Sequence, residues 1–342
     1  MGIRCFGSDN FSGVLPEIFK ILEEASYGHQ PSYGDDIYTQ KAEIEFKKIF
    51  GDNIDIYFVC SEAGANSLAI TPFIESYNGV ICSSSAHIYA DECGSLTKQS
   101  GCTLLPVTPF NGKITIDFIK NYMKGFGNQH HIQAKLISIS ESTELGTVYT
   151  IKEIKEICNY AHANNMYVHM DGSRLANAVS YLNCEPKDIV LETGIDVLSL
   201  GGSRNGMMFG EAVIFFNTKF KEKIKYIRKQ QMQLVTKNRF IAAQFYTILK
   251  DELWLKTAKH SNAMATLLAN EAEQIPNIQI TQEVQSNEVF AIIPRDKIDA
   301  IREKCFFYTW NEDASEVRWV CSFDTTENDV YELINIIRDE LL

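Results

Sequence analysis

Residues 135–174, KLISISESTELGTVYTIKEIKEICNYAHANNMYVHMDGSR, contain two short apolar segments separated by a stretch of helical periodicity. Lys135–Ser140 and Met166–Met170 have the length and the apolar content of buried strands. Between them, the apolar residues of Ile151–Asn164 recur every three or four positions and so lie on one face of a helix. A strand, a helix and a strand in this order predict two parallel strands joined by a right-handed crossover.

The same alternation extends over most of the chain. Five more short apolar runs are predicted to be strands: Ile56–Cys60, Val80–Cys82, Thr103–Val107, Asp196–Leu200 and Glu211–Phe216. A helix is predicted over Ala65–Ser76, directly after the first of these runs. Strands that alternate with helices predict an α/β domain, in which helices flank both faces of a mainly parallel sheet.

The pattern changes after Thr218 and is mostly helical as far as Glu273. The remaining residues predict three strands and a closing helix, at Val289–Ile293, Phe306–Trp310, Val317–Ser322 and from Thr326 to the end. This mixture predicts a small C-terminal α+β domain. We place a large domain over residues 1–245 and the small domain over residues 246–342, since cores of this size divide.

The overall charge excludes some classes of partner. The chain carries a net charge of −12, whereas nucleic acids and anionic membranes are bound by clustered Lys and Arg. No apolar run is long enough to span a bilayer, and the first residues hold no signal-peptide core, so we expect a cytoplasmic protein. The nine cysteines are scattered without a CxxC pair, which indicates reduced thiols and no metal site.

The most informative polar residue is Asp171, which directly follows the predicted strand Met166–Met170. Open α/β sheets bind ligands beyond the carboxyl ends of their strands. A carboxylate there can keep a heterocyclic nitrogen protonated, and Arg174 is spaced to fork onto a carboxylate or phenolate oxygen in the same cavity. The plainer interpretation is that Asp171 caps the next helix, which is the more common case for a single Asp after a strand.

Two other polar segments also follow predicted strands. Ser61–Asn66 is a turn of small residues at the start of a helix, where free N–H groups and the helix dipole attract phosphate. Such a turn also occurs where nothing is bound. His87 lies beyond Val80–Cys82, and its flat ring could stack on a planar cofactor, although a half-buried histidine bonded to the backbone is the commoner case.

A glycine-rich turn and a late arginine complete the set. Leu200–Gly206, LGGSRNG, follows a predicted strand, and its glycines require a tight turn or a close approach to a ligand. Arg318 lies inside the strand-like run Val317–Val320. Because a buried guanidinium needs a partner, Arg318 faces either solvent or an anion, and solvent is the default.

Taken in order, these motifs resemble the threonine aldolase and beta-eliminating lyase family, which has the aspartate-aminotransferase-like fold and depends on pyridoxal phosphate. The similarity extends over nearly the whole chain. It rests on Gly7–Asn10, Tyr33–Thr39, Gly64–Asn66, Ala86–Ile88, His169–Asn177, Arg318 and Asp324–Thr326.

The resemblance implies a role for each motif. For the cofactor it implies Gly64, Ala65 and Asn66 at the phosphate, His87 on the ring, Asp171 at the ring nitrogen, Arg174 at the phenolic oxygen, and Ser203 in the glycine-rich turn. For the substrate it implies Ser8, Tyr33, Arg174 and Arg318. The implied reaction cleaves a threonine-like 3-hydroxy-2-amino acid to glycine and an aldehyde. The implied assembly is a homodimer or homotetramer in which the segment Tyr33–Thr39 reaches the neighbouring active site.

Two positions depart from the family pattern. The place of the Schiff-base lysine is taken by Arg204, and no lysine lies within Gly201–Gly210. A guanidinium stays protonated in proteins, so it cannot form that bond. The loop Glu141–Glu144 has a glutamate where threonine aldolases usually show a histidine, which leaves the substrate preference open.

Three interpretations of the function follow. The first is a pyridoxal-phosphate-dependent lyase that is impaired by Arg204. The second is a binding or regulatory protein that kept the fold and lost the chemistry. The third is an engineered variant in which arginine replaced the lysine.

Overall fold

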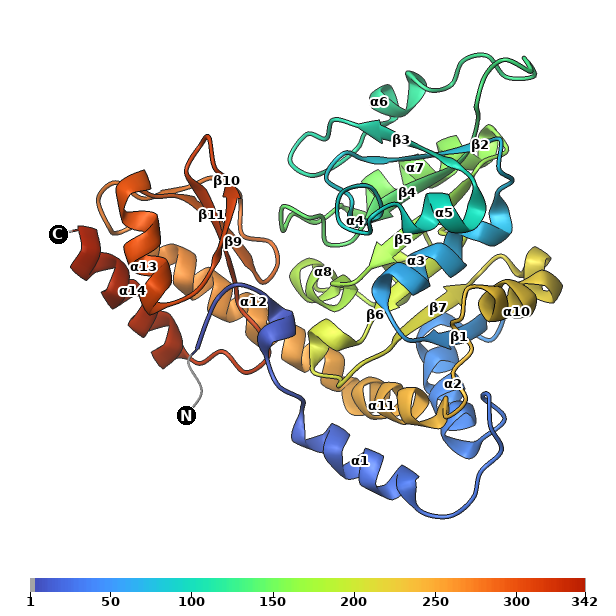
Figure 1. Ribbon diagram of the computed structural model, residues 1–342, viewed down its shortest axis with the longest axis horizontal. Coiled ribbons are helices and arrows are strands. Elements are labelled where there is room, and N and C mark those ends of the chain that lie inside the picture. Colours follow the sequence, from blue (N-terminus) through green and yellow to red (C-terminus); the bar gives the residue numbers. More distant parts are fainter. Residues whose placement is uncertain (1–3, 342) are drawn as a thin grey trace.

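The larger lobe is built on a seven-stranded sheet (Figure 1). The structure is a computed structural model that describes residues 4–341. In chain order the strands are β1 (Asp55–Val59), β2 (Asn78–Ser83), β3 (Thr103–Val107), β4 (Gln133–Ser140), β5 (Tyr167–Gly172), β6 (Val197–Gly201) and β7 (Glu211–Phe215). They lie in the order β1-β7-β6-β5-β4-β2-β3, and from β6 to β3 each neighbouring pair is parallel. The predicted mainly parallel α/β sheet is confirmed.

Strand β7 is antiparallel to both of its neighbours, β1 and β6. The cause is the short connection, residues 202–210, between β6 and β7. A parallel pair needs a crossover of about a dozen residues or more, so a turn of this length returns the chain in the opposite direction. This turn carries Arg204, and it lies at the carboxyl end of β6.

Helices cover both faces of the sheet. On one side lie α2 (Ile37–Phe50), α7 (Ile151–Ala163), α8 (Leu175–Leu182) and α11 (Arg239–Leu249), and on the other lie α3 (Glu62–Ile70), α5 (Ser95–Ser100) and α10 (Lys221–Gln230). Side chains of a strand alternate between the two faces. Accordingly Leu198 belongs to the first core and Val197 to the second. The remaining helices of this lobe are short, except for α1 (Pro16–Ser26), which packs on α11.

One predicted helix is shorter than expected. The sequence predicts a helix over Ala65–Ser76, whereas α3 ends at Ile70 and is followed by a 3-10 turn over Thr71–Phe73. Pro72 explains the difference, because proline lacks the N–H that an α-helix needs and disfavours helical backbone in the residue before it.

The smaller lobe has a four-stranded antiparallel sheet in the order β10-β11-β9-β8. Its strands are β8 (Gln279–Ile280), β9 (Glu288–Ile292), β10 (Tyr308–Asn311) and β11 (Glu316–Val320), and its helices are α12 (Leu253–Ala272), α13 (Ile298–Lys304) and α14 (Glu327–Leu341). The expected α+β lobe is therefore present. Strand β8 and helix α13 were not predicted, because both are too short to show a period.

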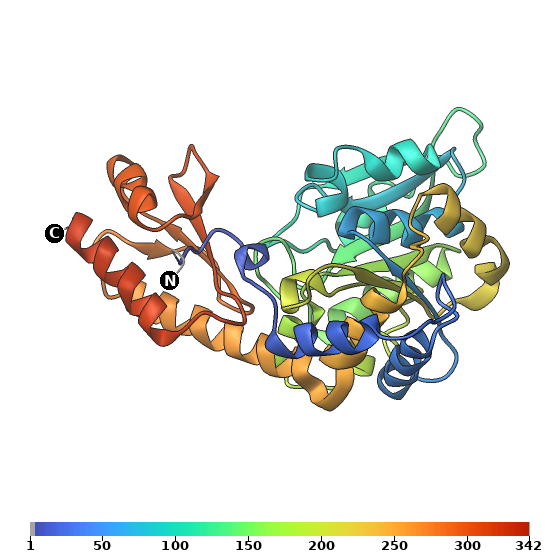
Figure 2. The same ribbon diagram turned by 60° about the horizontal axis from the view of Figure 1, so that its bottom comes forward.

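Two segments connect the lobes (Figure 2). Helix α12 places Trp254 in the core of the large lobe and Leu268 in the core of the small lobe. The N-terminal segment also joins the small lobe, since Phe6 is buried in that core and its carbonyl accepts a hydrogen bond from the Val320 amide. The division after residue 245 stays a prediction, because α12 and the N-terminal segment run between the cores. Within residues 4–341 no helix is both long and apolar enough to cross a membrane.

Candidate active site

Asp171 lies at the carboxyl end of β5, and its side chain bonds to Asn66 of α3. Figure 1 labels both elements, β5 in the sheet and α3 beside it. The carboxylate is buried, and its Oδ2 accepts a hydrogen bond from Asn66 Nδ2 at 2.9 Å. Its Oδ1 accepts from the Ser173 backbone N–H at 3.1 Å and from the Ser173 hydroxyl. It does not cap α8, which begins at Leu175 without a side-chain cap. Asp171 is therefore fixed by donors and aimed toward α3.

Asn66 links Asp171 to a second buried carboxylate, Glu92. Its Nδ2 also donates to Glu92 Oε1 at 2.8 Å, and the same oxygen lies 3.0 Å from His87 Nδ1. Burial acts to lower the pKa of His87. The hydrogen bond to Glu92 and the charges of Glu62 and Asp171 outweigh it and raise that pKa to about 9. His87 is thus a cation at neutral pH.

Glu144, in the loop that departs from the family pattern, lies against the same segment. Its Oε1 accepts from the Ser140 hydroxyl at 2.5 Å and from the His87 backbone N–H at 3.2 Å. Burial is the main cause that raises the pKa of Glu144 to about 7. Glu144 therefore fixes the backbone at the start of α4 (His87–Ala90).

The first turn of α3 is partly filled by the chain's own side chains. Ser61 caps the helix by accepting from the Gly64 N–H at 3.3 Å. Gln233 lies over Gly64 so closely that a Cβ there would be 2.4 Å from Gln233 Cδ. The Gln233 side chain also accepts from the Cys60 N–H at 3.0 Å. The first helical residue, Glu62, brings a carboxylate to the end of the helix that favours anions.

The glycine-rich turn after β6 forms a 3-10 helix over Ser203–Asn205. Gly201 allows a close approach, because a Cβ there would be 2.6 Å from the Ser173 carbonyl oxygen. Buried Glu211 braces the turn by accepting from the Gly202 N–H at 2.6 Å and from the Ser203 hydroxyl at 2.7 Å. Burial is the main cause that raises the pKa of Glu211 to about 7. Ser203 is therefore held by Glu211.

Arg204 points toward α3, where it is paired. Its Nη2 donates to Glu62 Oε2 at 2.5 Å, and its Nη1 lies 3.7 Å from Asp9 Oδ1. Burial acts to lower the pKa of Arg204, but Glu62 and Asp9 outweigh it and raise that pKa further above its ordinary value. The guanidinium is therefore a fixed cation whose charge is balanced within the protein.

The other two arginines are also paired with carboxylates. Arg174 donates to Asp9 through Nε at 2.9 Å and Nη2 at 3.2 Å, and its Nη1 lies 3.5 Å from Glu288. Arg318 Nη1 lies 3.6 Å from the other oxygen of Glu288. Burial acts to raise the pKa of Asp9, but Arg174 and Arg204 outweigh it and lower that pKa to about 2. These ion pairs thus form a continuous series in space in which acidic and basic side chains alternate, in the order Glu62, Arg204, Asp9, Arg174, Glu288, Arg318.

Most of the residues predicted for the site are joined by these contacts. Asn66, His87 and Asp171 form one group, joined through Glu92, and Arg174, Arg204 and Arg318 form a second, joined through Asp9 and Glu288. Ser173 links the two groups, because its hydroxyl lies within hydrogen-bond distance of both Asp171 Oδ1 and Glu62 Oε1. Gly64 and Ala65 lie in the same turn as Asn66, and Ser203 adjoins Arg204.

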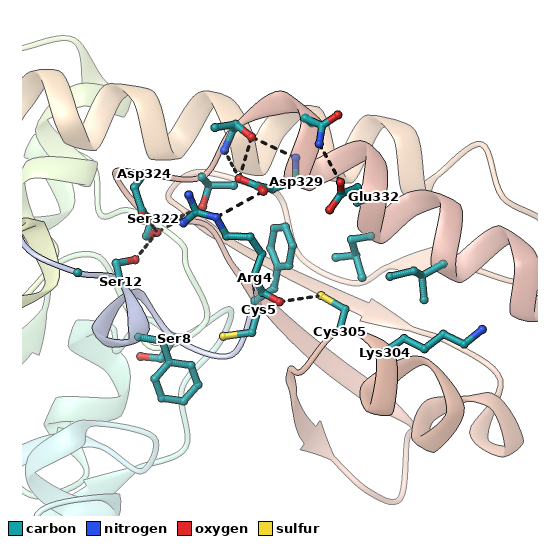
Figure 3. Close-up of a pocket in the computed structure, with 18 residues that line it drawn as sticks. Arg4, Cys5, Ser8, Ser12, Lys304, Cys305, Ser322, Asp324, Asp329 and Glu332 are labelled. Atoms are coloured by element: carbon teal, nitrogen blue, oxygen red, sulfur yellow. Dashed lines mark hydrogen bonds and ion pairs between the residues drawn. The ribbon is translucent and has the colours of Figure 1, made fainter. Parts of the chain in front are cut away.

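Within residues 4–341 the side chains of Ser8 and Tyr33 make no hydrogen bond or ion pair to this network, although Ser8 directly precedes Asp9. Ser8 lines a groove of about 880 Å³ between the N-terminal segment and α14, near Ser12 and the Arg4–Asp324 ion pair (Figure 3). Its hydroxyl accepts from the Asn10 N–H at 3.2 Å. Tyr33 is 49% exposed, and its backbone N–H donates to the Thr236 carbonyl. A contact of either residue with a ligand stays a prediction.

Sequence reasoning missed the carboxylates that balance the arginines. Asp9 and Glu62 fall within segments that were singled out, but their side chains were given no role. Glu288 had one signal, a lone acidic residue at the head of the apolar run Val289–Ile293. Asp9 and Arg174 are far apart in sequence, and no local pattern shows which charges pair across such a distance.

This chain is similar to proteins of known type over almost its full length. A sequence profile of the family described as beta-eliminating lyase matches residues 6–295. A low specificity L-threonine aldolase from a Pseudomonas species is 38% identical over 335 residues, which cover 97% of this chain and 96% of the relative. The Saccharomyces cerevisiae low specificity L-threonine aldolase is 28% identical over 85% of this chain and 74% of its own. The solved structure of Leishmania major threonine aldolase superposes with a TM-score of 0.93 at 25% identity, covering 99% of this chain and all of that one.

Proposed function

Because this chain belongs to the threonine aldolase and beta-eliminating lyase family, we propose that it binds pyridoxal phosphate without a covalent bond and that its aldol cleavage is impaired. Members of this family use pyridoxal phosphate. The proposed substrate is a threonine-like 3-hydroxy-2-amino acid, and the proposed products are glycine and an aldehyde. The observation that carries the proposal is the ion pair between Arg204 and Glu62.

The residues around Asp171, which we call the ring side of the candidate site, suit the pyridine ring of the cofactor. Asp171 is buried, and its two oxygens are oriented by Asn66 and Ser173. A carboxylate held this way can keep a pyridine nitrogen protonated, and the cofactor then acts as the electron sink for the cleaved bond. The Asn66 amide oxygen is buried and has no hydrogen-bond partner within residues 4–341, which leaves one acceptor at this point for a bound molecule. These residues support binding of the ring.

Arg204 does not suit a covalent bond to the aldehyde of the cofactor. A lysine amine attacks an aldehyde after it loses a proton, whereas Arg204 is kept charged by Glu62 and Asp9. Arg204 therefore acts as a fixed positive charge near the ring and not as a nucleophile.

The remaining residues bind and orient the substrate. Arg174 and Arg318 are the proposed partners of its carboxylate. With a pKa of about 9, His87 is protonated at neutral pH and donates a hydrogen bond rather than accepting the substrate's hydroxyl proton.

A second candidate is a binding protein without catalysis. It is favoured by Glu62, because the carboxylate occupies the helix end that would otherwise attract a phosphate. The two candidates differ in one outcome, which is whether a lysine at position 204 restores turnover.

The test is Arg204→Lys, alone and combined with Glu62→Gln so that the amine is not held protonated by the carboxylate. We expect the rate of L-threonine cleavage to rise by about 10²–10⁴-fold, which corresponds to roughly 3–5 kcal/mol of barrier. Arg204→Gln is the control, since it removes the guanidinium and supplies no amine. If neither lysine variant exceeds the control in cleavage rate, the chain is a binding protein.

We also propose that the protein is a cytoplasmic homodimer or homotetramer whose Tyr33–Thr39 segment reaches a neighbouring site. Tyr33 is half exposed and precedes α2, and large apolar side chains such as Phe209 and Met232 are also exposed. Sedimentation velocity at micromolar concentration tests this proposal. A stable monomer contradicts the shared site.

A further inference from the structure

Glu288 lies at the start of β9, between the two arginines that are the proposed partners of the substrate's carboxylate. Its side chain is fully buried, with one oxygen 3.5 Å from Arg174 Nη1 and the other 3.6 Å from Arg318 Nη1. Neither oxygen has a hydrogen-bond donor within the described residues, so these two cations are what stabilise its charge. Glu288 therefore holds the position between the arginines that an α-carboxylate would take.

The two lobes also enclose the Glu288 side chain. Gly146, in the loop after β4, has a positive φ of 69°, and a Cβ there would be 3.2 Å from Glu288 Cβ. The loop of the large lobe thus closes against Glu288. On the other side of Arg318, the Trp310 ring centroid lies 5.3 Å from the guanidinium carbon. Arg318 is held between this ring and Glu288.

The charges of this part of the pocket already balance. Asp9 and Glu288 are matched by Arg174 and Arg318, and Arg204 is matched by Glu62. A ligand carboxylate would add a negative charge with no unpaired cation beside it, although the buried Nε–H of Arg318 has no acceptor within the described residues. Burying an unpaired charge is strongly unfavourable, and two carboxylates at one site repel each other. A neutral hydroxyl or amide adds no charge and can still accept from the arginines.

We infer that Glu288 is an internal carboxylate that sets the specificity of this pocket, by cancelling the preference for an α-carboxylate and admitting a neutral polar group in its place. This inference rests on the proposed function, because it concerns the substrate end of the same pocket. It assigns the pocket ligands of the amino-alcohol or amino-amide class, in addition to amino acids.

Two stable conjugates of the cofactor test this inference without any covalent bond to the protein. N-(5′-phosphopyridoxyl)glycine ends in a carboxylate, and N-(5′-phosphopyridoxyl)ethanolamine ends in a neutral hydroxymethyl group. Their dissociation constants are measured by titration calorimetry on the unmutated protein. We expect the two constants to agree within about threefold, or the ethanolamine conjugate to bind more tightly, because the arginines are already neutralised.

Glu288→Gln then removes the internal charge and keeps the shape of the side chain. We expect this variant to bind the glycine conjugate at least about tenfold more tightly, because the positive charge of Arg318 no longer has an internal partner. The affinity for the ethanolamine conjugate should change little. Glu312→Gln is the matched control, since Glu312 is exposed on the same lobe and the change in net charge is identical. The two-ligand comparison on the unmutated protein tests the inference even if Glu288→Gln fails to fold.

The outcomes separate the inference from the proposed function. If neither conjugate binds the unmutated protein, the proposed function is wrong and the inference falls with it. If both bind and the glycine conjugate is already preferred by tenfold or more, the proposed function stands and the role of Glu288 is wrong. Equal binding that becomes a carboxylate preference in Glu288→Gln, and not in Glu312→Gln, supports the inference.

Discussion

Buried charge is compensated differently in two parts of the candidate site: the ring side, around Asp171, and the anion side, which is the alternating chain of charges from Glu62 to Arg318. On the ring side, Asp171 is satisfied by neutral donors from Asn66 and Ser173, so its charge remains available to a bound cation. On the anion side, every arginine of the alternating chain is balanced by a carboxylate of the protein itself. The charge of Asp171 is therefore not matched by these donors, whereas the charges of the anion side are matched within the protein.

An arginine of the expected type at the expected place in the sequence can therefore have its charge already used inside the protein. The family resemblance implies that Arg174 and Arg318 bind the substrate's carboxylate, yet in the structure Asp9 and Glu288 pair with these arginines. A guanidinium that already has a buried partner contributes less to binding an external anion, because the new bond replaces an old one.

The largest expected effect is on the ring side. We expect Asp171→Ala to weaken binding of pyridoxal phosphate by at least about 100-fold, or roughly 3 kcal/mol, because the buried partner of the ring nitrogen is lost. Equilibrium dialysis measures the change, and Asp52→Ala, at an exposed carboxylate, is the control. If Asp171→Ala binds pyridoxal phosphate as tightly as the unmutated protein, the ring of the cofactor does not bind beside Asp171.

The anion side predicts a smaller effect of opposite sign. Glu62→Gln removes a negative charge from the start of α3 and frees Arg204, so the cofactor phosphate should bind about tenfold more tightly, or about 1.4 kcal/mol. Glu23→Gln on the exposed face of α1 is the matched control. Unchanged or weaker binding in Glu62→Gln would show that the internal ion pair does not compete with the ligand.

An effect of similar size to that of Glu62→Gln concerns the pH dependence of stability. The pKa of His87 rises from about 6.5 in the unfolded chain to about 9 in the folded protein. Its contribution is therefore fully present below pH 6.5 and is lost as the pH rises to 9. Because His87 is partly exposed, we expect this contribution to be about 1–2 kcal/mol after solvent screening.

Urea unfolding at pH 6 and pH 9.5 measures the contribution of His87 to stability. The free energy of unfolding of the unmutated protein should fall between these values by about 1–2 kcal/mol more than that of His87→Gln. His130→Gln, in an exposed loop, should behave like the unmutated protein. An equal fall in His87→Gln would show that the pair of His87 and Glu92 does not contribute to the pH dependence of stability.

The fold could be predicted from the sequence because burial leaves a local signature. Strands β4 and β5 lie close to the runs Lys135–Ser140 and Met166–Met170, since a strand buried on both faces is mostly apolar. The direction of β7 has no such signature, because a period of two residues is the same in either direction. It follows from the length of the connection before it.

The candidate site could be predicted only in part. The order of the motifs indicated Asn66, His87, Asp171 and Arg204, and the structure joins these residues through short contacts. The partners of the arginines could not be predicted, because Asp9 and Glu288 reach Arg174 from opposite ends of the chain. Which charges meet is decided by the packing of the two lobes, and a local pattern contains no information about that.

We propose that Arg204 denies the cofactor a covalent bond while the residues around Asp171 still bind it. In the test, the unmutated protein and Arg204→Lys are incubated with pyridoxal phosphate, reduced with borohydride and digested, and the mass of the peptide that contains residues 201–210 is measured. We expect cofactor absorption in the visible spectrum of both proteins before reduction, and added mass on this peptide in the lysine variant alone. Added mass on the same peptide of the unmutated protein, or no cofactor absorption from that protein at all, would rule this role of Arg204 out.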